Sequence, residues 1–244
     1  MSIAAFQRSQ KPRGIKPTRP PVVPRLLNGD HLSVPVFERR YAAMPNGGKA
    51  ELIEGIVMMS PPIRSEHGKA HCLLASLLWQ YAAATPGVAC AVNSSLRLDG
   101  CNEYQPDVLL WIERENPAQA KTGPDGILEG RPELVVEIAL NSNTFELHEK
   151  KSVYQRNRIP EYIVWEMVDE PRFHWFTLEN GEYVSTVHRK LHGLVLCSYV
   201  FPGLWLDWPS LMVGRGFDKG VFRTLDRGLK SAEHRAFVKK LSKS

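Results

Sequence analysis

Hydrophobic and polar residues recur along this chain in two rhythms, one typical of strands and one of helices. Runs or alternations of Val, Leu, Ile and aromatic residues over 51–59, 88–98, 104–112, 134–139 and 162–165 predict β-strands. Residues 70, 74, 77 and 81 follow the spacing of a buried helical face, and Pro86-Gly87 ends that predicted helix. A second helix is predicted over 145–157. This order predicts an α+β (α/β-like) fold with a mixed central β-sheet flanked by helices.

Turn residues indicate which strands pair as added β-hairpins. Glu54-Gly55 divides 51–59 into two short strands, residues 99–102 join 88–98 to 104–112, and Asn180-Gly181 joins 173–178 to 183–187. Pro106 falls within a predicted strand, which favours a sheet edge or a strand start. Residues 113–131 are charged and rich in Gly and Pro, so they predict a surface loop.

The ends of the chain differ in charge from its middle. Residues 1–25 hold six Lys/Arg and no acid, and residues 213–244 hold nine Lys/Arg against three acids. Because the whole chain carries +5 and each end carries +6, the segment between them carries −7. We predict a disordered, basic, Pro-rich arm over 1–30, a single domain over 31–212 and a basic helical extension over 213–244 that lies outside the core. Two basic ends around an acidic body are compatible with a nucleic-acid partner, and equally with tails that only aid solubility.

Several classes of protein are excluded or disfavoured. The four cysteines show no CxxC pair and no His at zinc spacing, so no zinc site or disulfide framework is indicated. No run of about 18 apolar residues exists, which predicts no membrane span. The basic start of the chain lacks the apolar core of a signal peptide. These features predict a cytoplasmic protein. The absence of Gly-rich phosphate loops and of a G-x-S-x-G elbow disfavours nucleotide-binding proteins and serine hydrolases.

Two carboxylates lie in predicted buried strands, where an ionised group costs free energy. Asp107 and Glu137 each lie inside a run of Val, Leu, Ile and Trp that reads as a buried strand, and burying their charge requires a compensating cation. Mg²⁺ is held by one or two carboxylates and keeps several waters. We therefore predict a Mg²⁺ site at Asp107 and Glu137, with the backbone carbonyl of Ile138 as a third oxygen ligand and Mn²⁺ as a substitute metal.

A lysine beside such a metal would orient or help deprotonate an attacking water, or stabilise charge on a phosphate. Leu147 and Tyr154 are seven residues apart and share the packed face of the second predicted helix. Lys150 falls within that face and is the first candidate for an active-site lysine. Lys151 lies four residues after Leu147 and three before Tyr154, so it is the alternative active-site lysine. A purely structural alternative is that Lys150 is exposed and pairs with Glu146.

Five short motifs follow one another along the chain: Glu-Leu-Ile-Glu-Gly (51–55), Ser-Pro-Pro (60–62), Gln-Pro-Asp-Val (105–108), Leu-Val-Val-Glu-Ile (134–138) and Ile-Pro-Glu-Tyr (159–162). In this order they resemble the Uma-two family of endonucleases, within the PD-(D/E)XK, restriction-endonuclease-like superfamily. The resemblance covers about residues 35–210 and takes 198–206 as a closing strand. The resemblance implies a restriction-endonuclease-like sheet, the metal site at Asp107 and Glu137, and Glu54 as an additional catalytic carboxylate facing that site.

The chain departs from the superfamily motif at one position. Ala139, two residues after Glu137, stands where the motif has lysine, so the resemblance implies that Lys150 on the following helix takes that role. His67 opens the first predicted helix, where it either contacts a phosphate or has a structural role as a helix cap or core residue.

Three functions remain as hypotheses from the sequence. The first is a Mg²⁺-dependent endonuclease that hydrolyses DNA phosphodiester bonds through metal-activated water, with catalytic residues Glu54, Asp107, Glu137 and Lys150. The second is a non-catalytic nucleic-acid-binding module of the same fold, and the third is a metal-dependent phosphoesterase that acts on a smaller substrate. The sequence leaves open DNA against RNA and allows a homodimer.

Overall fold

The central element of the protein is a mixed sheet with strand order β12-β11-β10-β9-β6-β3. The computed structural model describes residues 22–45, 48–113, 119–140, 145–168, 171–185, 190–191, 195–212 and 219–243. The strands of this sheet are β3 (Val88–Val92), β6 (Val108–Ile112), β9 (Leu134–Ala139), β10 (Glu161–Glu166), β11 (Arg172–Glu179) and β12 (Glu182–Ser185). Strands β9 and β10 are parallel, and the other neighbouring strands are antiparallel.

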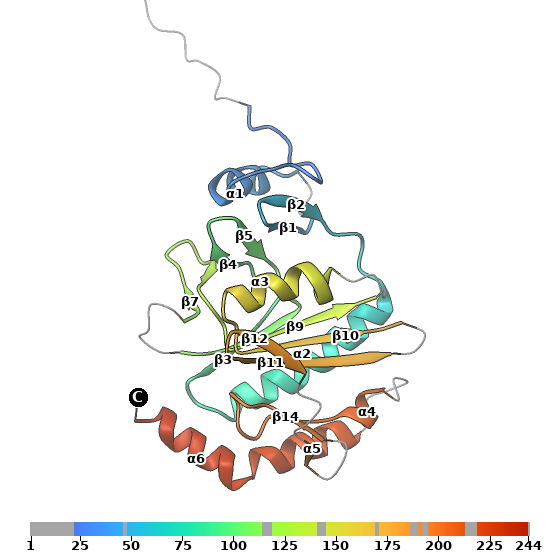
Figure 1. Cartoon of the computed structure of the whole chain (residues 1–244), viewed down its shortest axis with the longest axis vertical. Coiled ribbons are helices and arrows are strands. Elements are labelled where there is room, and N and C mark those ends of the chain that lie inside the picture. The colour runs from blue at the N-terminus through green and yellow to red at the C-terminus, as the bar shows by residue number, and fades with distance from the viewer. Residues whose placement is uncertain are drawn as a thin grey trace, which may run out of the picture.

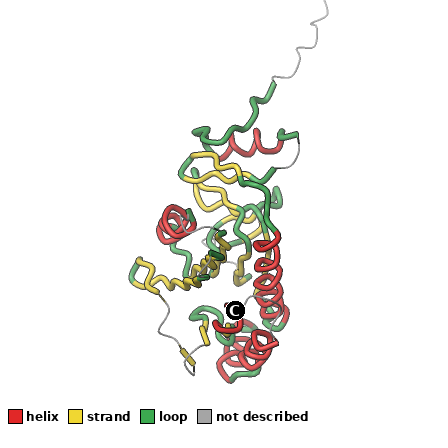
Figure 2. Tube along the Cα trace, turned by 90° about the vertical axis from the view of Figure 1, so that its right-hand side faces the viewer, coloured by secondary structure: helices red, strands yellow, loops and turns green. Residues whose placement is uncertain are grey.

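Helices cover both faces of this sheet, and alternate residues of β9 show why. Leu134, Val136 and Ile138 pack in the cluster that contains α2 (Ser65–Ala83). Val135 and Ala139 point to the opposite face and pack with Tyr154, which lies on α3 (Lys151–Arg156). Figure 2 shows the sheet between these two helical layers. The predicted fold class, a mixed sheet flanked by helices with added hairpins, is confirmed.

A second sheet, of order β2-β1-β5-β4-β8-β7, lies beside the first and is drawn above it in Figure 1. Helix α1 (Val34–Ala42) packs on this sheet through Phe37. The strands are β1 (Ala50–Ile53), β2 (Ile56–Met59), β4 (Leu96–Asp99), β5 (Asn102–Tyr104), β7 (Lys121–Thr122) and β8 (Leu128–Glu129). The short hairpin predicted within 51–59 is therefore present as β1 and β2. Strands β7 and β8 fall within the stretch predicted to be only a surface loop.

The hairpin predicted from 88–98 and 104–112 is present, but each of its strands is divided between the two sheets. Strand β3 pairs with β6 in the central sheet, whereas β4 pairs with β5 in the second. The break falls at Asn93, whose φ of 48° is a left-handed conformation that Asn tolerates. Pro106, which has no N–H to donate, lies between β5 and β6, in agreement with its predicted place at a strand start.

The C-terminal part differs from the sequence-based expectation in two ways. Residues 198–206 do not form one strand, because the turn around Pro202-Gly203 separates β14 (Val195–Cys197) from β15 (Trp205–Asp207), which pair in a small sheet with β13 (Lys190–Leu191). The helices α4 (Trp208–Met212), α5 (Lys219–Leu229) and α6 (Ala232–Leu241) follow. The expectation that this extension lies outside the core is wrong, because Val221 and Leu225, one helical turn apart, are buried in the same cluster as α2.

The N-terminal arm was expected to extend to residue 30, and residues 1–21 lie outside the described part of the chain. Leu26, however, is buried against α1, and the backbone N–H of Gly29 donates to the carbonyl of Val57. The packed domain therefore begins before the predicted boundary. In the described part of the chain, no helix is long and apolar enough to cross a membrane.

Candidate active site

The register of two central strands brings the predicted carboxylates together. Strands β6 and β9 are antiparallel, with Val108 opposite Val136. Continuing that register by one residue places Asp107 opposite Glu137 on the same face of the sheet. Both residues are 3% exposed. The predicted pairing of two buried carboxylates on neighbouring strands therefore agrees with the geometry.

Asp107 is held by donors from two directions. Its Oδ2 accepts a hydrogen bond of 2.7 Å from the backbone N–H of Ile138 and lies 3.3 Å from His67 Nε2. Burial opposes ionisation of this carboxyl, but the hydrogen bond and charge of His67 prevail and lower its pKa. Its backbone carbonyl lies 2.7 Å from His71 Nε2. The first two turns of α2 thus fix the position of Asp107.

The side chain of Lys150 approaches the carboxylates from the helical layer of α3, on the other face of the sheet from α2. It is 4% exposed, and its Nζ donates to Glu137 Oε1 at 2.9 Å and lies 3.0 Å from Glu51 Oε2. Burial opposes its charge, but the two carboxylates raise its pKa well above the usual value. Lys151 points elsewhere, with its Nζ 4.0 Å from the centroid of the Phe176 ring. The structure therefore brings Lys150, and not Lys151, to the carboxylates.

A π-helical turn precedes α3 and carries this lysine. In η1 (Glu146–Lys150) the N–H of Lys150 donates to the carbonyl of Phe145, five residues earlier. Such a turn inserts one residue relative to a regular helix and shifts the directions of the side chains around it, and π-turns occur frequently at functional sites. The sequence spacing predicted the helix but carried no signal for this turn.

Glu137 has a second donor in Tyr154, whose hydroxyl donates to Oε1 at 2.9 Å. Burial, with the charges of Asp107 and Glu51, raises the pKa of Glu137 to about 7, although Lys150 opposes this shift. The tyrosine ring is itself buried between Tyr104 and Tyr162. The orientation of this carboxylate is therefore fixed by side chains that have little freedom to move.

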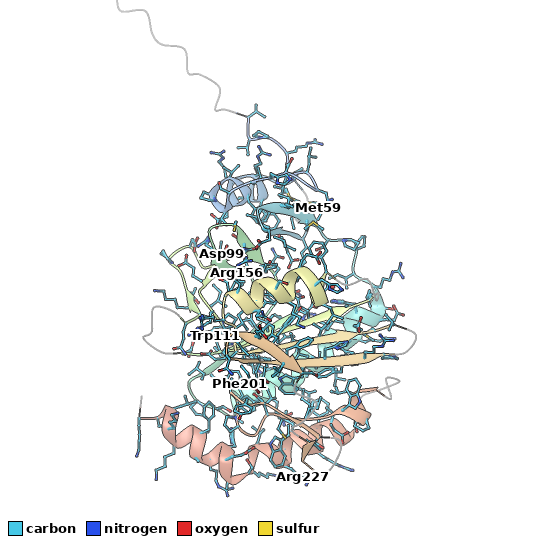
Figure 3. The ribbon with its side chains drawn as sticks, viewed as in Figure 1. Met59, Asp99, Trp111, Arg156, Phe201 and Arg227 are labelled. Atoms are coloured by element: carbon cyan, nitrogen blue, oxygen red, sulfur yellow. The ribbon has the colours of Figure 1, made fainter. Side chains whose placement is uncertain are left out.

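Glu51, which the sequence analysis did not select, contributes the third carboxylate of the cluster. It lies on β1 and is buried, and besides Lys150 its Oε1 accepts from the backbone N–H of Gln105 at 2.8 Å. Glu54, expected to face the site, instead lies in the β1–β2 turn and pairs with Arg156. Both side chains are about half exposed, and Arg156 is labelled in Figure 3 near Asp99. The structure thus places Glu54 outside the cluster, with Glu51 in the position expected for it.

A sequence comparison now bears on this arrangement. The model of the Uma2 family, described as "Putative restriction endonuclease", matches residues 35–209. This chain belongs to the Uma2 family.

Membership of Uma2 confirms the resemblance found in the motifs and supports a nuclease-like function. Among solved structures, the Uma2 chain is similar to a crystal structure described as a "putative nuclease" from Anabaena variabilis. The two are 13% identical, the match covers 78% of this chain and 97% of that chain, and the TM-score is 0.48. A search of curated proteins finds no match.

The donor set of the Uma2 site fits a hard divalent cation. Asp107 and Glu137 are buried oxygen donors, and although Lys150 pairs with Glu137, burial and the neighbouring carboxylates still raise the pKa of Glu137 to about 7. No group of three or more His, Cys, Asp or Glu side chains arranged to hold a metal occurs among the described residues. Mg²⁺ does not require one, because it is commonly bound through one or two carboxylates and retains waters. These oxygen donors are therefore of the kind that Mg²⁺ prefers and are unsuited to a soft metal.

Proposed function

We propose that this Uma2 chain is a Mg²⁺-dependent endonuclease that hydrolyses DNA phosphodiester bonds, with Mn²⁺ as a substitute metal. The observation that carries the proposal is a buried lysine between two carboxylates, beside a third carboxylate that directly precedes the neighbouring strand. Four chain segments supply Glu51, Asp107, Glu137 and Lys150. A constellation that is this costly to bury indicates function more strongly than it indicates stability.

Asp107 and Glu137, with the carbonyl of Ile138, would hold the metal ion. When bound, Mg²⁺ neutralises charge on a phosphate and lowers the pKa of a water molecule. The residues around the carboxylates have a positioning task. Tyr154 and Lys150 both donate to Oε1 of Glu137, and the N–H of Ile138 and His67 both reach Oδ2 of Asp107, so the two carboxylates are oriented before any ligand arrives.

Lys150 supplies the positive charge of the site. Its high pKa keeps the ammonium protonated at neutral pH, which suits it to stabilise negative charge on the phosphate during hydrolysis and not to accept a proton from water. The sequence alone allows both roles. We assign the electrostatic one, because the two carboxylates that flank Nζ favour the charged form.

The test compares plasmid cleavage and Mg²⁺ or Mn²⁺ titration calorimetry for the wild type, the double variant Asp107→Asn/Glu137→Gln and the control Glu54→Gln. Each substitution keeps the size of the side chain and removes a carboxylate, but the control does so outside the cluster. We expect the double variant to lose metal binding and to cut at least about 100-fold more slowly. The control should match the wild type.

Three outcomes would contradict the proposal in different ways. Full cleavage in EDTA would exclude metal dependence. Salt-dependent DNA binding without cleavage in any metal would favour a non-catalytic nucleic-acid-binding module. Hydrolysis of small phosphodiesters, without any affinity for DNA, would favour a phosphoesterase.

A further inference from the structure

The two C-terminal helices present a basic outer face far from the candidate active site. Residues 219–243 hold eight Lys/Arg and two acids. On α5 the buried residues Val221 and Leu225 leave Arg223 and Arg227 exposed on the other side of the helix. On α6 the buried side carries His234, and the exposed side carries Arg235 and Lys239, followed by Lys243. We call the exposed side chains Arg223, Arg227, Arg235, Lys239 and Lys243 the outer basic face.

The acids of these helices do not neutralise that face. Asp226 is paired with Lys230, which is not part of the outer basic face. Glu233 turns toward the β14–β15 hairpin, where it accepts hydrogen bonds from the indole N–H of Trp205 and the backbone N–H of Gly203. None of the five basic side chains takes part in an ion pair with another described residue.

Helix α2 separates this face from the carboxylates. Its first turns hold His67 and His71 against Asp107. Beyond its other end, Thr85 Oγ1 lies 2.9 Å from His234 Nε2 on α6. A helix of 19 residues is roughly 28 Å long at 1.5 Å per residue. Figure 1 shows α5 and α6 along the lower edge of the molecule, and Figure 3 labels Arg227 there, away from Arg156 and Asp99.

We propose that the outer basic face binds the phosphate backbone of nucleic acid, outside the segment that occupies the active site. Arg235 and Lys239 are four residues apart, so their Cα atoms are about 6 Å apart along one side of α6, a spacing suited to successive phosphates of one strand, and Lys243 follows in the turn after the helix. The length of α2, roughly 28 Å, corresponds to about eight base pairs at 3.4 Å each. The partner follows from the proposed nuclease function, on which this inference rests.

An anionic membrane is the other polyanion that such a face could contact. Helices that bind at membrane interfaces expose Trp, Phe or Leu beside their basic residues. The large hydrophobic side chains that are exposed among the described residues all lie outside α5 and α6. Phe237 and Leu241 of α6 pack against the core instead. The composition of this face therefore favours nucleic acid.

The test measures the affinity of the full chain for a 24-base-pair duplex by fluorescence anisotropy in EDTA, over a series of salt concentrations. The variant Arg227→Gln/Lys239→Gln removes two charges of the face, and neither side chain has a hydrogen-bonded partner among the described residues. The control Lys121→Gln/Arg172→Gln removes two exposed charges on strands β7 and β11. Each phosphate contact contributes about 0.9 to the slope of log affinity against log salt. We expect the slope to fall by about 2 in the variant and to stay unchanged in the control.

An unchanged slope in the variant, with normal duplex binding by the wild type, would overturn this inference and leave the proposed nuclease function standing. An equal decrease of the slope in the variant and in the control would also overturn the inference, because a general loss of positive charge would then explain the result. Loss of binding to phosphatidylserine vesicles, without a change in duplex binding, would replace nucleic acid by a membrane as the partner. A reduced slope in a protein that never cleaves would support the inference while the catalytic proposal fails.

Discussion

Replacing Lys150 by Met tests whether Glu51 and Glu137 are buried and depend on the Lys150 ammonium group for charge compensation. Methionine nearly matches the length of the lysine side chain but leaves Glu51 and Glu137 buried without their cation. A pair of charges 2.9 Å apart attracts by about 6 kcal/mol at an effective dielectric constant of 20. Because the variant no longer has to bury an ammonium group, part of that loss is recovered. We expect a net decrease of about 3–5 kcal/mol in the free energy of unfolding at pH 8.

The assay is urea unfolding followed by tryptophan fluorescence at pH 8 and at pH 5. The pKa of Glu137 is raised to about 7 even with Lys150 present, so the carboxyl group in the variant takes up a proton at pH 5 and no longer needs a cation. The decrease should therefore be smaller at pH 5 than at pH 8.

Lys151→Met is the matched control on the same helix. Its ammonium lies over the Phe176 ring and not against a carboxylate, so its loss should cost about 0.5–1 kcal/mol at either pH. A loss below about 1 kcal/mol for Lys150→Met at pH 8 would refute the reasoning, because the carboxylates would then be hydrated in solution. Equal losses for the two variants would refute the assignment of Lys150.

Two further carboxylates give separate predictions. Burial raises the pKa of Glu161 to about 7 from 4.5, despite donors such as the Ser198 hydroxyl. A group whose folded pKa is raised contributes stability below its unfolded pKa and loses it as the pH rises through the folded one. Glu161→Gln should therefore flatten the pH dependence of the unfolding free energy by about 3 kcal/mol between pH 4.5 and 7, and parallel urea-unfolding curves for variant and wild type would contradict this. Glu54→Gln breaks a half-exposed pair with Arg156. It should lower the free energy of unfolding by less than about 1 kcal/mol and leave plasmid cleavage unchanged. A loss of cleavage like that of Glu137→Gln would show instead that Glu54 belongs to the active site.

The elements that depend on local pattern could be predicted from the sequence, because their spacing carries the information. Ala70, Leu74, Leu77 and Tyr81 mark α2, and all four are buried on one face. The break between β3 and β4 falls at the polar residues Asn93-Ser94-Ser95, and Asn93 adopts a left-handed conformation there. These residues are typical of an interruption, but local pattern does not encode that the strand on each side of the break pairs in a different sheet.

The choice between Lys150 and Lys151 illustrates a limit set by helix geometry. Spacings of three and four residues place either lysine beside Leu147 and Tyr154 in a regular helix. The π-turn in η1 shifts the register at this point, and it leaves Lys150 buried and Lys151 over Phe176. A one-residue change of register depends on packing between distant segments, and periodicity within the helix does not encode it.

Glu51 could have been found by the criterion that selected the other two carboxylates. Asp107 and Glu137 stand out in the sequence because each lies in an apolar run, and Glu51 lies in the apolar strand β1, whose four residues are all buried. Glu54 is favoured only by the family resemblance, although it stands in a turn where an exposed carboxylate costs little.

The contacts of Glu51 also explain how distant segments assemble. One carboxylate binds both Lys150 and the backbone of Gln105, two residues before Asp107, so β1 fixes the positions of the lysine and of Asp107 together.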